Sequence, residues 1–340
     1  MASGLSAGTN SLNGSMESSP KREGQSTTNQ GQTNLKHVVS VKDLSRSWLM
    51  TLIEKAELLR QTPRPLVRER LAGAMVATLF YEPSTRTRMS FEAALTRLGG
   101  SIIGAENALE NSSAKKGETL SDVFRVVGSY VDAIVIRHHE TDAVAQASIY
   151  SPVPVISAGT GSGEHPTQAM LDMYTLWREY GHLDGLKITV VGDLKYGRTV
   201  HSLLQCLTWF EGVQVTLISP KALSLPSDML EQLRASGLDV KQGKNFHEAL
   251  KTTDVVYQTR IQTERLVDDA EAQAAKDYSI GLTELGLLLP HARILHPLPR
   301  VGEIDPSVDQ DHRAAYFRQV ENGLYMRMAL LDELLGGVAR

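Results

Sequence analysis

The sequence predicts an α/β protein made of two doubly wound parallel-sheet domains. Short apolar runs rich in β-branched residues alternate with helical patterns along the chain, as buried parallel strands alternate with their crossover helices. The alternation occurs in two similar series, one on each side of a helical segment at 166–180. A chain of 340 residues is long enough for two domains of ordinary size.

The first series alternates strands with helices whose apolar residues repeat at i, i+3, i+4 and i+7. After the first of these helices, Gly99 and Gly100 supply a helix stop. The predicted strands are 74–81, 132–137 and 153–157, and the predicted helices lie around 91–98 and 120–127.

The second series also alternates strands with helices. It is followed by a last helix, whose apolar pattern does not show on which domain it packs. The apolar positions of 324–335 are compatible with packing on either half of the chain. The predicted strands are 187–193, 213–219, 254–260 and 293–300, with a helix at 199–210.

Composition excludes several classes of function. The net charge of −4 lacks the basic excess typical of nucleic-acid binding, so no nucleic-acid partner is expected. No apolar run approaches the roughly 18 residues that a membrane span needs, so no membrane partner is expected. The one cysteine, Cys206, allows neither a disulfide within the chain nor a thiolate metal cluster. Because metal and nucleotide motifs are also missing, no metal and no cofactor are expected.

Residues 1–34 form a polar segment that is predicted to be disordered. The segment is rich in Ser, Gly, Asn, Thr and Gln, so it cannot bury enough apolar surface to fold. It has no apolar stretch of the kind found in secretory signals. A single cysteine fits a cytoplasmic location, while the serine content leaves an organelle transit peptide as the alternative to a simple tail.

The stretch "FYEPSTRTRMSFEAALTRLGG" predicts an anion site at a helix start. A strand ends at Phe80, and Ser84, Thr85, Arg86 and Thr87 open the next helix. Main-chain N–H groups at a helix start carry partial positive charge, and an arginine fork adds two donors suited to phosphate oxygens. The simpler alternative is that Ser84 or Thr85 only caps the helix. Two arginines in the first turn oppose the helix dipole unless an anion offsets them, which favours the anion site.

Other polar residues also follow predicted strands, where ligands of open α/β sheets bind. Arg137 ends the strand "DAIVIR", and Arg198 opens a helix after "VVGDLKYG". A glycine-rich loop lacking the dinucleotide-binding spacing leads to His165 and Gln168, while Arg260 and Gln262 follow a fourth strand. Each arginine alone could be a surface residue in a salt bridge. Together they indicate a site for anionic substrates that works by positioning and charge stabilisation.

The loop "SSAKKGETLSD" is harder to interpret from spacing alone. It carries Ser112, Lys115 and Lys116 before a helix but lacks the spacing of a phosphate-binding P-loop. On spacing it is best interpreted as an exposed, solvated loop. No nucleophile elbow or Ser-His-Asp order indicates acyl-enzyme chemistry elsewhere in the chain.

These segments together resemble the catalytic chains of the aspartate carbamoyltransferase family. The resemblance covers about residues 37–336 and includes "PSTRTR", "KKGET", "RHHE", "HPTQ", "GDLKYGRT", "TRIQTER" and "HPLPR". Ornithine carbamoyltransferases, the main alternative within the wider family, typically have a cysteine where this chain has Pro297. A non-catalytic relative is the alternative from another class, although such proteins usually lose the anion-binding groups that this chain keeps.

The resemblance implies transfer of the carbamoyl group from carbamoyl phosphate to L-aspartate, an early step of pyrimidine biosynthesis. It implies a carbamoyl-phosphate-binding domain over 35–168, completed by a C-terminal helix at 322–340 that packs back on it, and an aspartate-binding domain over 169–321. The implied carbamoyl-phosphate site comprises Ser84, Thr85, Arg86, Thr87, Arg137, His165, Gln168, Pro297 and Leu298, of which Arg86, Thr87, Arg137 and His165 are the implied catalytic residues.

The resemblance further implies that Lys116, Arg198, Arg260 and Gln262 bind aspartate. It also implies that Ser112 and Lys116 come from a neighbouring subunit, so that a homotrimer shares its active sites. A higher assembly with regulatory chains or other pyrimidine enzymes is compatible with it. Arg88 matches no ligand contact of the family and is expected to be structural or solvated.

Overall fold

Two parallel sheets carry the fold in the part of the chain that the computed structural model describes, residues 37–106, 108, 117–161, 163–261 and 278–336. These residues belong to one compact unit. Buried residues on both faces of each sheet pack in separate core clusters. The predicted fold class, two doubly wound parallel-sheet α/β domains, is therefore confirmed. The predicted tail at 1–34 lies outside the described residues.

The first sheet has the strand order β2-β1-β3-β4, and all its neighbours pair in parallel. Neighbouring residues of β1 and β3 face opposite layers: Val76 and Val135 pack in one core cluster, Ala77 and Ile134 in another. A sheet buried on both faces needs this nearly continuous apolar sequence. The strands are β1 (Met75–Phe80), β2 (Ser101–Glu106), β3 (Ala133–His138) and β4 (Val155–Thr160).

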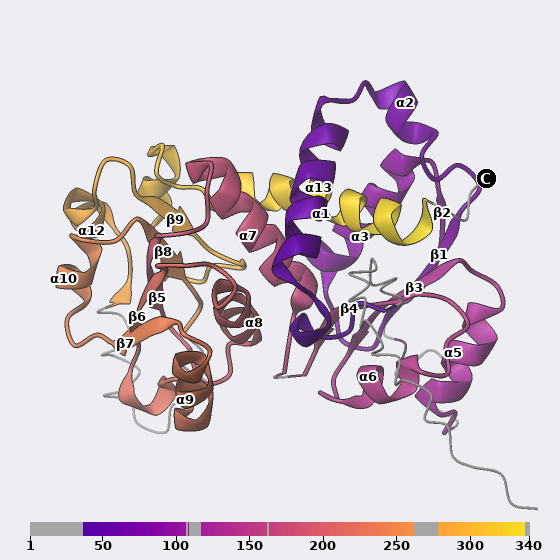
Figure 1. Cartoon of the computed structure of the whole chain (residues 1–340), viewed down its shortest axis with the longest axis horizontal. Helices are drawn as coiled ribbons and strands as arrows, with labels where there is room; N and C mark the ends of the chain where they lie inside the picture. Colours follow the sequence, from indigo (N-terminus) through magenta and orange to yellow (C-terminus); the bar gives the residue numbers. More distant parts are fainter. Residues whose placement is uncertain (1–36, 107, 109–116, 162, 262–277, 337–340) are drawn as a thin grey trace, which may run out of the picture. The chain divides into compact units, whose positions relative to one another are not determined.

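Helices cover both faces of this sheet (Figure 1). The face with Val76 packs on α1 and α3, whose buried residues include Leu49 and Leu95. The opposite face packs on α5 and α6 through Phe124 and Val144. The helices of this half are α1 (Arg46–Gln61), α2 (Arg64–Arg68), α3 (Thr85–Leu98), α5 (Leu120–Gly128) and α6 (Ala143–Ser148), with a short 3₁₀ helix at Val41–Asp43.

The second sheet has the order β7-β6-β5-β8-β9 and is also parallel throughout. Val190 and Val191 lie in different core clusters, so this sheet is also covered on both faces. Its strands are β5 (Lys187–Val191), β6 (Gln214–Ile218), β7 (Asp239–Gln242), β8 (Val255–Gln258) and β9 (Arg293–Leu295). Its helices are α8 (Arg198–Leu207), α9 (Ser227–Ala235), α10 (Phe246–Leu250) and α12 (Leu282–Leu287), with 3₁₀ helices at Lys221–Leu223 and Pro306–Gln310.

Two helices connect the sheets, α7 (Pro166–Tyr180) and α13 (Tyr316–Leu335). All residues of α7 from Pro166 to Leu176 are buried, and one core cluster runs through this helix from the first sheet to the second. Helix α13 packs on α1, α3 and α7 (Figure 1). The prediction that the C-terminal helix packs back on the first domain is therefore confirmed.

Several predicted boundaries were wrong, and some elements were not predicted. The strand predicted over 293–300 ends at Leu295, because Pro297 and Pro299 have no N–H groups for a sheet. Helix α13 begins at Tyr316 rather than near 324. Strands β2 and β7 and helix α1 were not predicted at all. No helix among the described residues is both long and apolar enough to cross a membrane.

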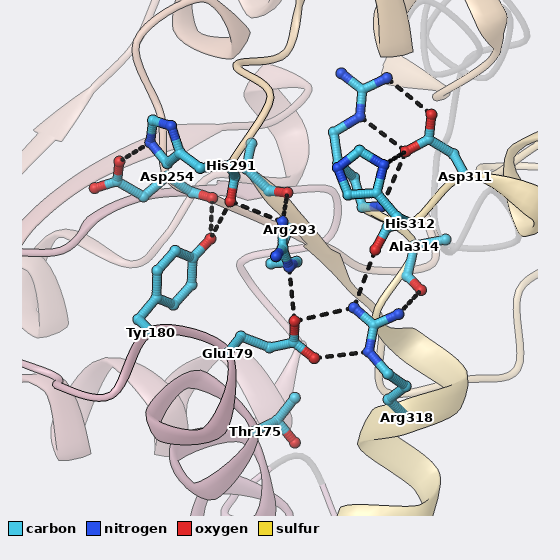
Figure 2. Close-up of polar contacts among 12 residues, drawn as sticks. Thr175, Glu179, Tyr180, Asp254, His291, Arg293, Asp311, His312, Ala314 and Arg318 are labelled. Atoms are coloured by element: carbon cyan, nitrogen blue, oxygen red, sulfur yellow. Dashed lines mark hydrogen bonds and ion pairs between the residues drawn. The ribbon is translucent and has the colours of Figure 1, made fainter.

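A charged cluster joins the end of α7 to β9 and to the start of α13 (Figure 2). Glu179 accepts a hydrogen bond from Arg293 Nε at 2.6 Å and another from Arg318 Nε at 2.7 Å. Beside it, the Tyr180 hydroxyl donates to the Asp254 carbonyl at 2.6 Å. Burial alone would raise the pKa of Glu179, but its bonds to Arg318 and Arg293 lower it below the usual value.

Replacing Glu179 by Gln should lower the free energy of unfolding by about 2 kcal/mol at pH 7, because the amide presents a donor to one of two arginines. Since the folded-state pKa is depressed, the carboxylate stabilises the fold above the unfolded value of about 4.3, and this contribution is lost as the pH falls through the folded value. The difference between wild type and Glu179→Gln, measured by urea unfolding, should therefore shrink below about pH 4.

Glu248→Gln is the matched control for this prediction. Glu248 pairs with Lys251 at 2.7 Å, but the two side chains are 64% and 48% exposed. An exposed ion pair contributes at most about 0.5 kcal/mol on a helix. Equal losses in the two variants would show that the Glu179 cluster does not brace α7 against β9 and α13.

Candidate active site

A cavity of about 570 Å³ lies where the carboxyl ends of strands from both sheets meet helix starts. Its lining comes from the end of β3, from segments that follow β1, β4, β5, β8 and β9, and from residues of α7 and α13. Every predicted site residue that the structure describes lines this cavity: Ser84, Thr85, Arg86, Thr87, Arg137, His165, Gln168, Arg198, Arg260, Pro297 and Leu298. The predicted residues Ser112, Lys116 and Gln262 lie outside the described part of the chain.

The start of α3 forms one wall of the cavity. The first helical hydrogen bond runs from Arg88 N–H to the Ser84 carbonyl at 3.1 Å, so the preceding N–H groups have no acceptor within the helix. The Ser84 side chain makes no capping bond, and its Oγ accepts instead from Arg137 Nη1 at 3.2 Å. The interpretation of Ser84 as a side-chain helix cap is therefore wrong, and these N–H groups are available to an anion.

Arg88 does not belong to this site, as expected. Its Nε donates to Glu92 Oε1 at 2.8 Å, one helical turn further along α3. It does not line the cavity. The prediction that Arg88 is structural is confirmed, and it leaves Arg86 as the first-turn arginine at the cavity.

Arg137 is held at the end of β3 by groups from the β1–α3 segment. Its Nε donates to Glu82 Oε2 at 3.2 Å, while its Nη1 reaches Ser84. Burial, with a smaller contribution from neighbouring Arg198, lowers its pKa to about 10. The guanidinium therefore stays charged at neutral pH, but in an environment where a bound anion would be strongly favoured.

The His165 side chain is neutral in this environment. It is 4% exposed, and burial followed by the charges of Arg198 and Arg137 lowers its pKa well below the usual value. Its main-chain N–H donates to Ser202 Oγ at 2.9 Å, which fixes the start of α7. A Cβ on Gly159, which has φ +110°, would lie 3.2 Å from the imidazole and 3.5 Å from the Arg198 guanidinium. Glycine is therefore required here for the histidine and arginine to pack against the main chain.

Arg198 links the cavity to the second sheet. Its Nη1 donates to the Gly161 carbonyl at 2.6 Å and lies 3.6 Å from Glu82 Oε2. Arg198 and Arg260 also line an adjoining cavity of about 530 Å³. Two arginines at the second end of the site suit a ligand with two carboxylates.

The segment after β9 lines the same cavity. His296 Nδ1 accepts from the Leu298 N–H at 2.7 Å, and His296 Nε2 lies 2.7 Å from Glu303 Oε1. These contacts hold Leu298 at φ +55°, a backbone region that leucine rarely adopts. Pro297 and Leu298 of this turn line the cavity.

Sequence reasoning missed several lining residues, above all Gln319 and Arg327 of α13. Arg327 is buried, donates from Nη1 to Ser90 Oγ at 2.9 Å and has its Cζ 5.1 Å from the centre of the Phe91 ring. Its Nε has no hydrogen-bond partner among the described residues, and burial lowers its pKa to about 10. An arginine within the apolar run of 324–335 was the available signal.

Family models and known relatives match most of the chain. Residues 36–178 match the family model described as "Aspartate/ornithine carbamoyltransferase, carbamoyl-P binding domain", and residues 184–334 match "Aspartate/ornithine carbamoyltransferase, Asp/Orn binding domain". The chain is 48% identical over 301 residues to an aspartate carbamoyltransferase catalytic subunit of Methanothrix thermoacetophila, covering 88% of this chain and 98% of that protein. It is 47% identical to a chloroplastic aspartate carbamoyltransferase of Arabidopsis thaliana, covering 89% of this chain and 78% of that protein.

The chain is also similar to a solved structure. Aspartate transcarbamoylase from Trypanosoma cruzi, in complex with carbamoyl phosphate and aspartate, superposes with a TM-score of 0.82 at 40% identity. The superposition covers 88% of this chain and 95% of that one. The chain therefore belongs to the aspartate carbamoyltransferases, within the aspartate/ornithine carbamoyltransferase family.

Proposed function

We propose that the chain transfers the carbamoyl group of carbamoyl phosphate to the amino group of L-aspartate, giving N-carbamoyl-L-aspartate and phosphate. The observation that carries this proposal is the single cavity that joins an anion site at the start of α3 to two arginines of the second sheet. The solved relative from Trypanosoma cruzi holds these same two substrates. The reaction is an early step of pyrimidine biosynthesis.

The phosphate is assigned to the α3 end of the cavity. The free N–H groups around Thr85, Arg86 and Thr87 and the Arg86 guanidinium bind its oxygens, helped by Ser84. Arg137 is close enough to Ser84 to contact both the phosphate and the carbamoyl oxygen. This arrangement uses the positive end of a helix and a planar arginine fork, which both favour phosphate.

The carbamoyl carbon is assigned to the region between Arg137 and His165. The neutral amine of aspartate attacks this carbon, and the carbonyl oxygen gains negative charge as the new C–N bond forms. Thr87, Arg137 and neutral His165 stabilise that oxygen by donating hydrogen bonds, which is worth several kcal/mol in a desolvated site, about 3 for one donor. The bond to the phosphate oxygen then breaks, and the departing phosphate accepts the proton that the amine nitrogen loses.

The two carboxylates of aspartate are assigned to Arg198 and Arg260. Gln262 is proposed to assist them, although it lies outside the described residues. Ornithine would bring a cationic side chain into a region that already carries two arginines, so it is disfavoured. Gln168 and the carbonyls of Pro297 and Leu298 are assigned to the carbamoyl and amine nitrogens.

The test supplies carbamoyl phosphate with either aspartate or ornithine and identifies the product by mass spectrometry. Carbamoyl-aspartate should form with aspartate. Faster formation of citrulline would support the ornithine alternative. A folded chain that turns over neither amino acid would support a non-catalytic relative.

A homotrimer with shared sites is also proposed, in which Ser112 and Lys116 of one subunit complete the site of the next. Both residues lie outside the described part of the chain, so the support is the sequence resemblance. Inactive Lys116→Ala and Arg86→Ala chains, unfolded and reassembled together, should recover about a quarter of the wild-type activity, because mixed trimers form some intact sites. No recovery in mixed trimers verified by native mass spectrometry would contradict shared sites; the same measurement shows whether larger assemblies form.

The domain limits and the cellular location also remain proposals. Residues 35–168 with 322–340 would form the carbamoyl-phosphate-binding domain and 169–321 the aspartate-binding domain, with α7 running across the limit.

A cytoplasmic location is proposed, with the name of the chloroplastic relative supporting the organelle alternative. Microscopy of the full chain with a C-terminal fluorescent tag distinguishes the two compartments.

A further inference from the structure

The carboxylate of Asp172 lies fully buried behind the cavity, one helical turn after Gln168 on α7. Its Oδ1 accepts from Gln168 Nε2 at 2.8 Å and from Gln319 Nε2 at 2.6 Å. Its Oδ2 accepts from the Tyr257 hydroxyl at 2.7 Å. Three donors from α7, α13 and β8 therefore converge on one carboxylate that does not itself line the cavity.

This contact fixes which end of the Gln168 amide faces the cavity. An ionised carboxylate has no proton to donate, so the amide atom that faces it must be the nitrogen. The Gln168 carbonyl oxygen is then directed away from Asp172, and Gln168 is one of the residues that line the cavity. The Gln168 carbonyl oxygen is therefore not used by Asp172 and remains as an acceptor for a ligand.

Gln319 connects Asp172 to the main chain that follows β9. Its nitrogen faces Asp172, and its Oε1 accepts from the His296 N–H at 2.9 Å. Gln319 is 1% exposed, so these bonds are shielded from water. Asp172 is therefore connected through one side chain to the segment that carries the Pro297 and Leu298 carbonyls.

The protonation of Asp172 is set by opposing effects. Burial raises its pKa to about 7, against the three donated hydrogen bonds and the charge of Arg327, which favour the ionised form. The three donated hydrogen bonds match an ionised carboxylate, whose two oxygens can only accept.

We propose that Asp172 is a positioning residue for carbamoyl specificity, fixing Gln168 and, through Gln319, the 296–298 main chain as hydrogen-bond acceptors around the carbamoyl nitrogen. This inference rests on the proposed function. An NH₂ group has two protons to donate and fits such a set of acceptors. The methyl group of an acyl phosphate satisfies none of them, and leaving buried acceptors unpaired is costly.

The test compares two stable ligands that differ only in this group, phosphonoacetamide with its NH₂ and phosphonoacetone with its CH₃. Dissociation constants are measured by calorimetry on the full chain at pH 8. Wild type should prefer the amide. Asp172→Asn should reduce that preference by about tenfold, because a neutral amide oxygen holds the two glutamines less firmly than a carboxylate.

Asp332→Asn is the matched control, since Asp332 is also a buried carboxylate of the helical layer but binds Arg70 and Lys55 and does not line the cavity. It should lower stability and leave the ligand preference unchanged. A merely structural role for Asp172 would weaken both ligands equally in Asp172→Asn, and that result would overturn the proposal. In a Gln168→Leu background, Asp172→Asn should change the preference less than it does in wild type, because part of its effect acts through Gln168.

If Asp172→Asn does not fold, Gln319→Met keeps the carboxylate but removes both its hydrogen bond from Gln319 and the bond from Gln319 to the His296 N–H. This variant should reduce the preference for the amide by about threefold, and an unchanged preference would overturn the proposal. Failure of the wild-type chain to bind either ligand or to form carbamoyl-aspartate would contradict the proposed function instead.

Discussion

Replacing Arg86 by Ala should lower kcat/KM for carbamoyl phosphate by about 10³-fold, because the variant loses a charged donor where charge accumulates on the leaving phosphate. Arg86 lies in the first turn of α3, beside main-chain N–H groups without helical acceptors. Those N–H groups remain in the variant, so some phosphate binding should persist. Initial rates of carbamoyl-aspartate formation against carbamoyl phosphate concentration measure the effect.

Arg88→Ala provides the control for this prediction. Arg88 lies two residues further along the same helix and pairs with Glu92 instead of lining the cavity. Its removal should change activity by less than about twofold and cost about 0.5 kcal/mol of stability. Equal losses of activity in the two variants would indicate a general effect on the start of α3, and wild-type turnover in Arg86→Ala would contradict the role assigned to its guanidinium.

The position of the site could be predicted because parallel strands end at a common edge. Phe80 pairs with Arg137 in the register of β1 and β3, so the residues that follow both strands meet at that edge. The same rule brings Arg198 and Arg260 together, since β5 and β8 are neighbours. Local sequence therefore identifies such residues without knowledge of the rest of the fold.

The contributions of α13 could not be predicted in the same way. Gln319 and Asn322 are buried, but polar residues on a helix normally indicate an exposed face, so the predicted helix began eight residues too late. Their burial is compensated by hydrogen bonds to Asp172 and Thr175 on α7. Those partners lie about 147 positions away in sequence, which no local pattern reveals.

Edge strands were missed for a related reason. In β7 only Val240 is buried, and charged or polar residues surround it. Such a strand carries little of the apolar signal by which β1 and β3 were identified. At β9 the predicted strand was instead too long. The apolar pattern continues past Leu295, but the chain there forms a turn whose conformation depends on the contacts of His296.

Replacing Arg198 by Ala should lower kcat/KM for aspartate by about 10³-fold, because truncating one partner of a desolvated charge pair costs several kcal/mol. The Arg198 side chain is 18% exposed and is fixed by the Gly161 carbonyl, so it is already oriented for a carboxylate. The loss should appear mainly as a higher KM for aspartate. Binding of carbamoyl phosphate, measured without aspartate, should change much less.

Lys195→Ala is the control for Arg198→Ala, since Lys195 is an exposed cation of the same segment, placed over the Tyr196 ring outside the cavity. Lys195→Ala should leave the KM for aspartate unchanged. If a nearby positive charge alone attracted aspartate, both variants would raise this KM, and the KM would also depend on the salt concentration. If Arg198→Ala weakened carbamoyl phosphate while aspartate kept its wild-type KM, the assignment of the two cavity ends would have to be exchanged. The proposed order, phosphate at α3 and carboxylates at α8, requires the two variants Arg86→Ala and Arg198→Ala to affect different substrates.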